Sequence, residues 1–301
     1  MLSTVAAVWL AATAAVAAPP TDAGSATAYA ARVIGPPPPS AKLDPFYQRY
    51  VDAEGVPIAS SAAVPDAALL AARDIAVAML AERPDLRRAM IATGFRVAIM
   101  AEAEGTVDLP EQRDWKKPTI DDERLTICER KHYAKRIGSL TDREYWNGRA
   151  RGMGGLLTSA ATENLLGVPG TRYFGENIFV HEFSHAILEA AHQVDPALYA
   201  RVERAYASAM QRGMWKGEYA AVTIDEYWAE GTQTWFNSNK VAVVDGRRIL
   251  SDAELAAYDV ALYNGLSEVY GTRHRLPGDV YFQHPARVPP GPLPQSTAEV
   301  C

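Results

Sequence analysis

The sequence predicts an α+β fold that is rich in helices and has a small sheet. Apolar residues recur at helical spacing in several stretches, whereas one short run alternates in the way of a strand. Hydrophobic residues make up 48% and charged residues 22% of the 301 residues, which is the composition of a globular protein with a sizeable core. We expect one domain over residues 46–301, preceded by two segments of different character.

Residues 1–18 have the pattern of an export signal. An apolar run from Leu2 to about Ala18 ends at AVA, a small-x-small sequence typical of signal cleavage sites. Two features count against an export signal: no lysine or arginine precedes the run, and proline follows the expected cut closely. A membrane-spanning helix is disfavoured, because the run is alanine-rich and shorter than ~20 residues. We therefore predict a signal peptide, a secreted or periplasmic location and no stable membrane span.

Residues 19–45 are predicted to be a proline-rich linker. They contain PPTDAGSATA and, at Gly35–Ser40, GPPPPS. Such a run is a stiff spacer or, alternatively, a polyproline ligand for a partner. The sequence leaves open whether this segment is removed or blocks a site.

The charge and the cysteines restrict the partners. The net charge is −6 and no basic patch stands out, so we expect no nucleic acid as a partner. The two cysteines, Cys128 and Cys301, fit no metal-ligand spacing. Export would place them where disulfides persist, so they either pair or remain two free thiols. The sequence sets no oligomeric state.

The first elements of the domain follow from apolar spacing. The stretch PDAALLAARDIAVAML is predicted to be a helix, because its apolar residues lie mostly along one broad face: Leu69, Leu70, Ile75, Ala76 and Leu80. Pro84 and Asp85 start a second, shorter helix, and Gly94 ends it. FRVAIM, residues 95–100, then alternates as a strand does. Residues 105–150 are polar and irregular, which is typical of a segment that frames a site and equally of a surface excursion.

The second half of the chain carries clear helix signals. Asp195 is a good N-cap with Pro196 at the first helical position. TIDEYWAEGTQTWF is amphipathic and aromatic, which predicts a buried helix. Ser251 and Glu254 form a capping-box pattern that starts the last helix, and the end of the chain is a tail without periodicity.

The stretch NIFVHEFSHAILEAAH contains the sequence H-E-x-x-H at His181, Glu182 and His185. Residues four apart lie on one face of a helix, so the two imidazoles can bind one metal ion. Glu182 stands beside the ion and can take a proton from a water whose pKa zinc lowers toward ~7. The surrounding residues are apolar, and polar side chains in a buried helix need compensation, which zinc supplies.

His192 is a poor third ligand. It lies near the same face as His185, but about 10 Å further along the helix axis at 1.5 Å per residue. The metzincin pattern brings its third histidine back by breaking the helix at a glycine. Here Leu188 and Ala191 occupy the glycine and histidine positions of that pattern, so His192 is interpreted as a polar residue near the helix end.

The stretch DEYWAEG provides the better candidates, Glu226 and Glu230, four apart on one helical face. A carboxylate from a second helix completes a His₂Glu zinc site with an open position for water. The other carboxylate can then hydrogen-bond the far nitrogen of a zinc-bound histidine and fix its orientation. Helix geometry alone permits either assignment.

HEFSH followed downstream by DEYWAEG resembles the gluzincin metallopeptidases, in particular those of the anthrax lethal factor and Pro-Pro endopeptidase type. The resemblance covers residues 177–231. It implies a zincin-like domain in which the first glutamate of E-x-x-x-E, here Glu226, is the third zinc ligand and Glu230 supports a ligand. It also implies a tyrosine seven positions before that glutamate, here Tyr219, which assists at the substrate carbonyl.

The sequence therefore predicts an exported zinc-dependent peptidase. Zinc is the cofactor, a peptide or protein is the substrate, and Glu182 is the general base. The strand near 95–100, or the segment GGLLTSAATENLL, is expected to offer an edge for an extended peptide. Two alternatives remain: a zinc hydrolase of a non-protein amide such as cell-wall material, and a non-catalytic protein that keeps the zinc fold for binding. The presence of Glu182 disfavours the second, because a binding module needs no general base.

Overall fold

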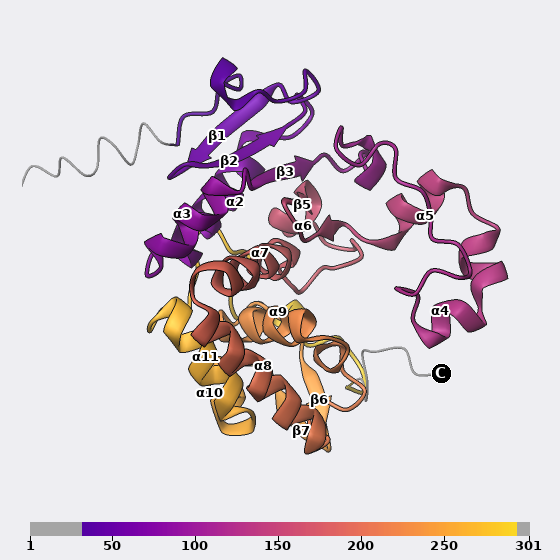
Figure 1. Cartoon of the computed structure of the whole chain (residues 1–301), viewed down its shortest axis with the longest axis vertical. Helices are drawn as coiled ribbons and strands as arrows, with labels where there is room; N and C mark the ends of the chain where they lie inside the picture. Colours follow the sequence, from indigo (N-terminus) through magenta and orange to yellow (C-terminus); the bar gives the residue numbers. More distant parts are fainter. Residues whose placement is uncertain (1–31, 294–301) are drawn as a thin grey trace, which may run out of the picture.

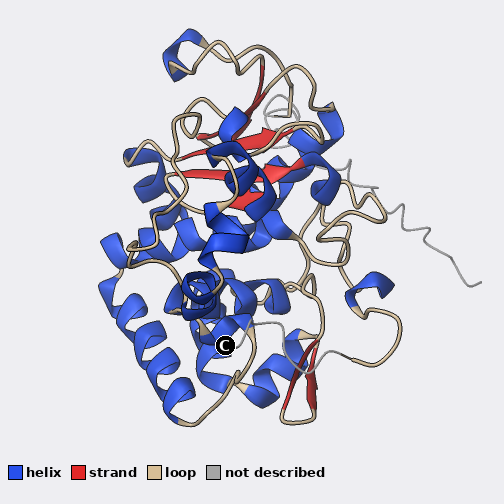
Figure 2. Ribbon diagram, turned by 90° about the vertical axis from the view of Figure 1, so that its right-hand side faces the viewer, coloured by secondary structure: helices blue, strands red, loops and turns tan. Residues whose placement is uncertain are grey.

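The structure, a computed structural model, describes residues 32–293. The predicted signal peptide, the first part of the predicted linker and Cys301 lie outside the described residues. Within the described part the chain is mixed α and β, helix-rich with a small sheet, as expected (Figures 1 and 2). No helix there is both long enough and apolar enough to cross a bilayer.

A five-stranded sheet forms the upper part of the molecule in Figure 1, in the order β1-β2-β3-β5-β4. Its strands are β1 (Arg49–Ala53), β2 (Val56–Ser60), β3 (Arg96–Met100), β4 (Gly152–Met153) and β5 (Leu157–Ala161). β2, β3 and β5 run parallel, while β1 and β4 are antiparallel to their neighbours. The short strand β4 is therefore one edge of the sheet.

The expected strand at 95–100 is confirmed as β3, but its position in the sheet is not the expected one. β3 lies between β2 and β5, and β5 within GGLLTSAATENLL lies between β3 and β4. β3 offers no edge to a peptide, so the expectation was wrong for residues 95–100. β5 is covered by β4 only at Ser159 and Ala160. Both faces of β3 are buried: Val97 and Ile99 join the main core, while Ala98 and Met100 join a smaller cluster on the other face.

Helices cover the sheet and continue below it. Two lie beside the first strands, α2 (Asp66–Met79) and α3 (Pro84–Ala92), as the sequence predicted. α6 (Thr162–Leu165) leads from β5 to the central helix α7 (Ile178–Val194), which packs in the main core between the sheet and the helices that follow. These are α8 (Pro196–Gln211), α9 (Ile224–Trp235), α10 (Asp252–Tyr258) and α11 (Val260–Tyr270).

The predicted helix starts are confirmed by their caps. The Asp195 carboxylate accepts a hydrogen bond from Leu198 N at 3.1 Å, with Pro196 as the first residue of α8. Ser251 and Glu254 form the capping box of α10. The chain does not continue as one last helix, because Asp259 caps a new one, α11, through Leu262 N. A hairpin of β6 (Ala242–Val244) and β7 (Arg247–Ile249) precedes α10.

Residues 101–151, here called the arm, project from the end of β3 at the right of Figure 1 and return to β4. The arm was expected to be irregular, yet it contains four short helical segments: η2 (Thr106–Asp108), α4 (Ile127–Lys131), η3 (Ala134–Gly138) and α5 (Asp142–Arg149). Three of its buried side chains form a cluster of their own, separate from the main core: Leu125, Ile137 and Tyr145. Nearer the base, Leu109 joins the smaller cluster on the sheet. Arg151 fastens its base, with an ion pair to Glu163 at 2.6 Å.

Two further predictions fall partly within the described residues. Gly35 of the predicted linker forms an isolated bridge with Tyr50 of β1, so this part of the linker contacts the sheet. Cys128, in α4, is buried and is not a free thiol. Because Cys301 lies outside the described residues, pairing of the two cysteines stays a prediction.

Candidate metal centre

α7 presents both histidines of the H-E-x-x-H sequence. Asn177 caps the helix by accepting a hydrogen bond from Val180 N at 3.2 Å. The apolar face of α7 packs into the main core through Phe179, Val180, Phe183 and Ile187. One turn apart, the rings of His181 and His185 lie with their centroids 5.0 Å apart, as the helical spacing predicted.

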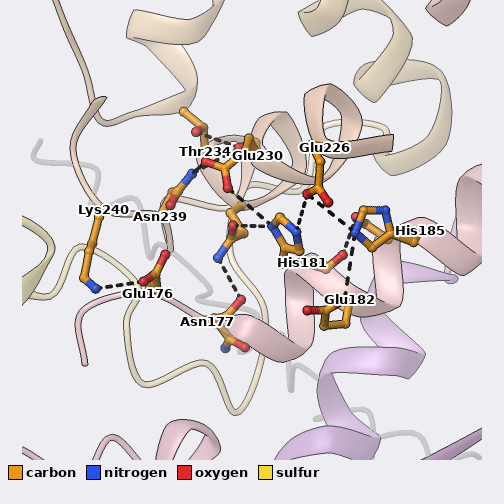
Figure 3. A network of polar contacts seen from close by, with 12 residues as sticks. Glu176, Asn177, His181, Glu182, His185, Glu226, Glu230, Thr234, Asn239 and Lys240 are labelled. Carbon is orange, nitrogen blue, oxygen red and sulfur yellow. Dashed lines mark hydrogen bonds and ion pairs between the residues drawn. The ribbon is translucent and has the colours of Figure 1, made fainter. Parts of the chain in front are cut away.

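α9 brings a carboxylate to the two imidazoles. Glu226 Oε2 lies 2.9 Å from His181 Nε2 and 3.8 Å from His185 Nε2 (Figure 3). Zinc–nitrogen bonds of ~2.0–2.1 Å in a tetrahedral site put two ligand atoms about 3.3 Å apart. The observed separations lie on either side of that value, so these three side chains fit one zinc ion.

Glu182 lies next to the same atoms. Its Oε2 is 3.9 Å from His185 Nε2, and the backbone N–H of Gly154 donates a hydrogen bond to its carboxylate. Ligand atoms of His181, Glu182 and His185 all lie within 4.8 Å of one another, so Glu182 too is within range of a cation. The two carboxylates are about equally near His185, at 3.8 and 3.9 Å, while Glu226 is in hydrogen-bond contact with His181 at 2.9 Å.

Burial and charge shift the pKa values of these groups. Burial raises the pKa of Glu182 to about 7, and it lowers the pKa of His185 to about 4 with help from the nearby His181. Burial is the largest influence on His181 and disfavours its charged form, but the hydrogen bond to Glu226 and the charges of Glu182, Glu230 and Glu226 together outweigh it and raise the pKa. Burial raises the pKa of Glu230 to about 7. Three carboxyl groups lie around two imidazoles, so the site has more acidic than basic groups. This composition favours the binding of a cation.

Tyr219, in η4 (Tyr219–Ala221), stands over the pair formed by His181 and Glu226. Its hydroxyl hydrogen-bonds Glu226, and its ring is nearly parallel to that of His181, with centroids 6.2 Å apart. The side chain is 43% exposed and lines the cavity described below. The structure thus brings Tyr219 to the cluster, as the resemblance implied.

Glu230 and Gln233 lie on the opposite side of the His181 ring. Glu230 Oε1 is 3.5 Å from His181 Nδ1, while Gln233 Oε1 is only 2.9 Å from it. Asn239 Nδ2 donates to Glu230 Oε2 at 2.8 Å (Figure 3). Gln233 and Asn239 were missed in the sequence. Gln233 carried a signal, because it follows Glu226 by seven positions and shares its helix face.

His192 is not part of the cluster. It lies in the last turn of α7 with its side chain 55% exposed, and its ring stacks on Tyr199 with centroids 4.1 Å apart. This confirms the interpretation of His192 as a polar residue near the helix end.

A cavity of about 1160 Å³ opens in front of these residues. One wall is formed by α7 and α9, and the other by arm residues that include Ile137, Leu140, Tyr145 and Arg149. The edge strand β4 and the glycines after it, 154 and 155, line the floor between the two walls. The arm thus frames the site, which was one of the two expectations for residues 105–150.

Comparisons with known proteins identify the chain only weakly. No protein-family model matches it, and no curated protein does. Among solved structures, the Pro-Pro endopeptidase of Paenibacillus alvei superposes with a TM-score of 0.41 and 15% sequence identity, covering 70% of this chain and 96% of that one. A likeness at this level fixes neither substrate nor mechanism.

Proposed function

We propose that this chain is a zinc-dependent peptidase with a zincin-like catalytic domain over residues 46–301. The observation that carries the proposal is the position of Glu226 Oε2, 2.9 Å and 3.8 Å from the Nε2 atoms of His181 and His185. Two histidines and a carboxylate are the ligand set of catalytic zinc in several peptidases, and this set leaves a coordination position open.

Glu182 is the general base. A zinc ion held by the three ligands supplies a Lewis acid that makes water acidic enough to react near neutral pH. Glu182 takes the proton of the attacking water and returns it to the leaving amine. Glu182 lies beside the proposed ligands, with its Oε2 3.9 Å from His185 Nε2, so it is placed to take and return that proton.

Tyr219 stabilises the charge that develops on the substrate carbonyl oxygen. Its hydroxyl reaches Glu226, and the residue is 43% exposed and lines the cavity. A phenol hydroxyl is a donor that can turn from the carboxylate to the oxyanion during the reaction.

The substrate is a peptide in an extended conformation. The cavity has a volume of about 1160 Å³, and β4, which lines it, forms one edge of the sheet. Backbone groups of Gly152 and Met153 on the side away from β5 have no neighbouring strand among the described residues. An added peptide strand would pair with them.

We further propose that the enzyme is exported and works outside the cytoplasm, in a secreted or periplasmic location. Its support is the sequence pattern of residues 1–18. Residues 19–45 then connect the cleavage site to the catalytic domain.

The first test is the metal content and its link to hydrolysis. Purified protein should hold one zinc per chain and cleave a denatured protein mixture, and a chelator should abolish cleavage. Zinc well below one equivalent that added metal does not restore would overturn the proposal. Digestion of purified cell wall in place of protein would favour the non-protein amide.

The second test is Glu182→Gln, with Glu203→Gln on the exposed face of α8 as the matched control. Glu182→Gln removes the base and no ligand, so zinc should stay while hydrolysis falls by ~10²–10⁴-fold. The control should match the unaltered protein. Activity of Glu182→Gln within about tenfold of the control would exclude Glu182 as the base.

A further inference from the structure

Both ring nitrogens of His181 have a polar partner within hydrogen-bond distance. Nε2 faces Glu226 at 2.9 Å, on the side of the proposed zinc ion. Nδ1 faces Gln233 Oε1, also at 2.9 Å. Gln233 is fully buried in α9, so water does not compete for this contact. The protonation of Nδ1 therefore depends on which end of the Gln233 amide faces it.

A backbone carbonyl decides that question. The Gln233 Nε2 donates a hydrogen bond to the carbonyl oxygen of Asn177 at 2.9 Å. A carbonyl oxygen only accepts, so the amide nitrogen must face Asn177 and the amide oxygen must face His181. Turning the amide over would place two oxygens against each other. Since Gln233 Oε1 also only accepts, Nδ1 of His181 must carry the proton.

Asn177 is itself held firmly. Its side chain accepts from Val180 N and donates to Asp279 Oδ1 at 2.8 Å, and its own N–H donates to the Ser238 carbonyl at 3.0 Å. As the N-cap of α7 it stands one turn before His181. The Asn177 carbonyl, which orients Gln233, therefore lies at the N-terminal end of α7, the helix that carries His181.

Glu230 does not hold the same position. Its Oε1 is 3.5 Å from His181 Nδ1, which is longer than a good hydrogen bond, and its Oε2 is occupied by Asn239 at 2.8 Å. Glu230 thus adds negative charge near the ring, while Gln233 makes the directional contact. The family resemblance pointed to Glu230 for this contact, and the distances point to Gln233.

We propose that Gln233 is a positioning residue for the metal site, which fixes the ring plane of His181 and keeps its proton on Nδ1. Without a metal, Nε2 donates its own proton to Glu226 at 2.9 Å. Where zinc takes the place of that proton, the lone pair of Nε2 is directed toward the ion, between Glu226 and His185. This inference rests on the proposed zinc site. It adds that the Gln233 side-chain amide, whose orientation the Asn177 carbonyl fixes, keeps the proton of His181 on Nδ1 and so leaves Nε2 for the metal.

The experiment compares Gln233→Met with Gln211→Met, a control on the exposed end of α8, and with Glu230→Gln. Methionine keeps the length of the side chain and removes both hydrogen bonds. The Asn177 carbonyl retains the backbone N–H of His181 at 3.3 Å as a partner, which favours folding of the variant. Zinc affinity is measured by competition with a chelator, after each metal-free protein is shown to melt in one transition.

Gln233→Met should bind zinc ~10–100-fold more weakly, as changes to partners of metal-bound histidines typically do. Glu230→Gln should lose less, and Gln211→Met nothing. In zinc-loaded protein with ¹⁵N-labelled histidine, the Nδ1–H signal of His181, assigned by its absence in His181→Asn, should exchange with water faster in Gln233→Met. A structural role alone would not change that signal selectively.

Two outcomes would overturn the inference and are distinct from failure of the proposed function. If Gln233→Met folds and binds zinc as tightly as Gln211→Met, Gln233 does not position the histidine. If Glu230→Gln loses more affinity than Gln233→Met, the carboxylate is the main partner. If the unaltered chain binds no zinc, the proposed function itself fails.

Discussion

The wall formed by α7 and α9 and the wall formed by the arm face each other across one cavity, and their side chains are held by different means. In the first wall, Tyr227 and Trp228 lie fully buried in the main core, and Trp228 Nε1 donates to the Ser184 carbonyl at 3.1 Å. The arm has its own small hydrophobic cluster and is also held by ion pairs, such as that of Arg149 with Glu129 at 2.6 Å. Figure 1 shows the arm, with α4 and α5, at the right of the molecule, away from α7 and α9.

This difference assigns metal binding to one wall and substrate binding to the other. Groups that hold a metal must stay within a few tenths of an ångström of their places, and burial in a shared core provides that. A wall with a separate core can shift without disturbing them. Changes in the α7–α9 wall should therefore alter metal binding, and changes in the arm should alter only local stability and substrate binding.

The largest effect is expected from Glu226→Ala in the first wall. It removes the carboxylate nearest to both histidines, so zinc should be lost from the purified protein, as elemental analysis would show. Glu230→Ala on the same helix should retain zinc with ~10–100-fold weaker binding. The reverse order, with Glu230→Ala empty and Glu226→Ala loaded, would exchange the roles of the two glutamates.

Arg151→Met tests the base of the arm. The Arg151 guanidinium pairs with the buried Glu163 and also donates to the Ala101 carbonyl at 3.2 Å. Removing one partner of a buried ion pair typically costs about 3–5 kcal/mol. Denaturant unfolding should report a loss of that size in the metal-free protein, whereas zinc affinity of the folded protein should not change.

The control for this variant is Arg143→Met in α5, whose side chain is largely exposed and pairs with Asp108. A surface pair of that kind contributes ~0–1 kcal/mol. Equal losses for the two arginine variants would mean that Arg151 is not the anchor of the arm.

Gly154→Ala tests the place where the two regions meet. A Cβ at Gly154 would lie 2.8 Å from Cδ2 of His185, too close for two carbons, so the ring or the strand end must shift. Overpacking of this kind costs about 1–3 kcal/mol, and here it should appear as weaker zinc binding. Gly148→Ala in α5, where a Cβ meets nothing within 4 Å, is the matched control. Unchanged zinc binding in Gly154→Ala would show that the backbone or the His185 ring can shift without disturbing the metal site.

The smallest effect comes from a pair of helix caps, one in each region. Thr141 caps α5 through Glu144 N, and Thr223 caps α9 through Glu226 N, each at 3.2 Å. Replacing either threonine by alanine should cost ~1 kcal/mol. Only Thr223→Ala should also weaken zinc binding, because its helix carries the proposed ligand. A drop in zinc affinity with Thr141→Ala would mean that the two walls are coupled.

The helices of the site could be predicted from the sequence because their signals are local. Asp195 with Pro196, and Ser251 with Glu254, mark helix starts within a few residues, and the spacing of His181 and His185 fixes their shared face. The sheet was largely missed. β5 reads LTSAA, with little β-branched character, and β4 is only two residues long. Strand order depends on contacts between distant segments, so no local pattern shows that β3 is internal.

The outer parts of the site escaped prediction for a related reason. In the sequence, Gln233 is one polar residue in an aromatic helix. Its orientation toward His181 depends on a hydrogen bond to the Asn177 carbonyl, which lies far from it in sequence. The cluster of Leu125, Ile137 and Tyr145 joins short segments whose apolar residues are too sparse for a periodic pattern. Polar composition correctly marked the arm as unusual, but it could not show that the arm folds around its own core.

The two ends of the arm meet at its base, where Val107 N donates to Asn147 Oδ1 at 3.1 Å and Arg151 reaches back to Ala101. The strands of the sheet are therefore joined at this point whatever length of chain lies beyond it. Doubling a flexible connection adds only about 0.6 kcal/mol to the entropy of closing it. Leu109 and Glu111 still contact the sheet, and Arg113 pairs with Asp44. For an engineer, the exchangeable cassette therefore begins after Arg113 and ends before Asn147: it can be shortened or replaced to change which peptides enter, while α7 and α9 are left untouched.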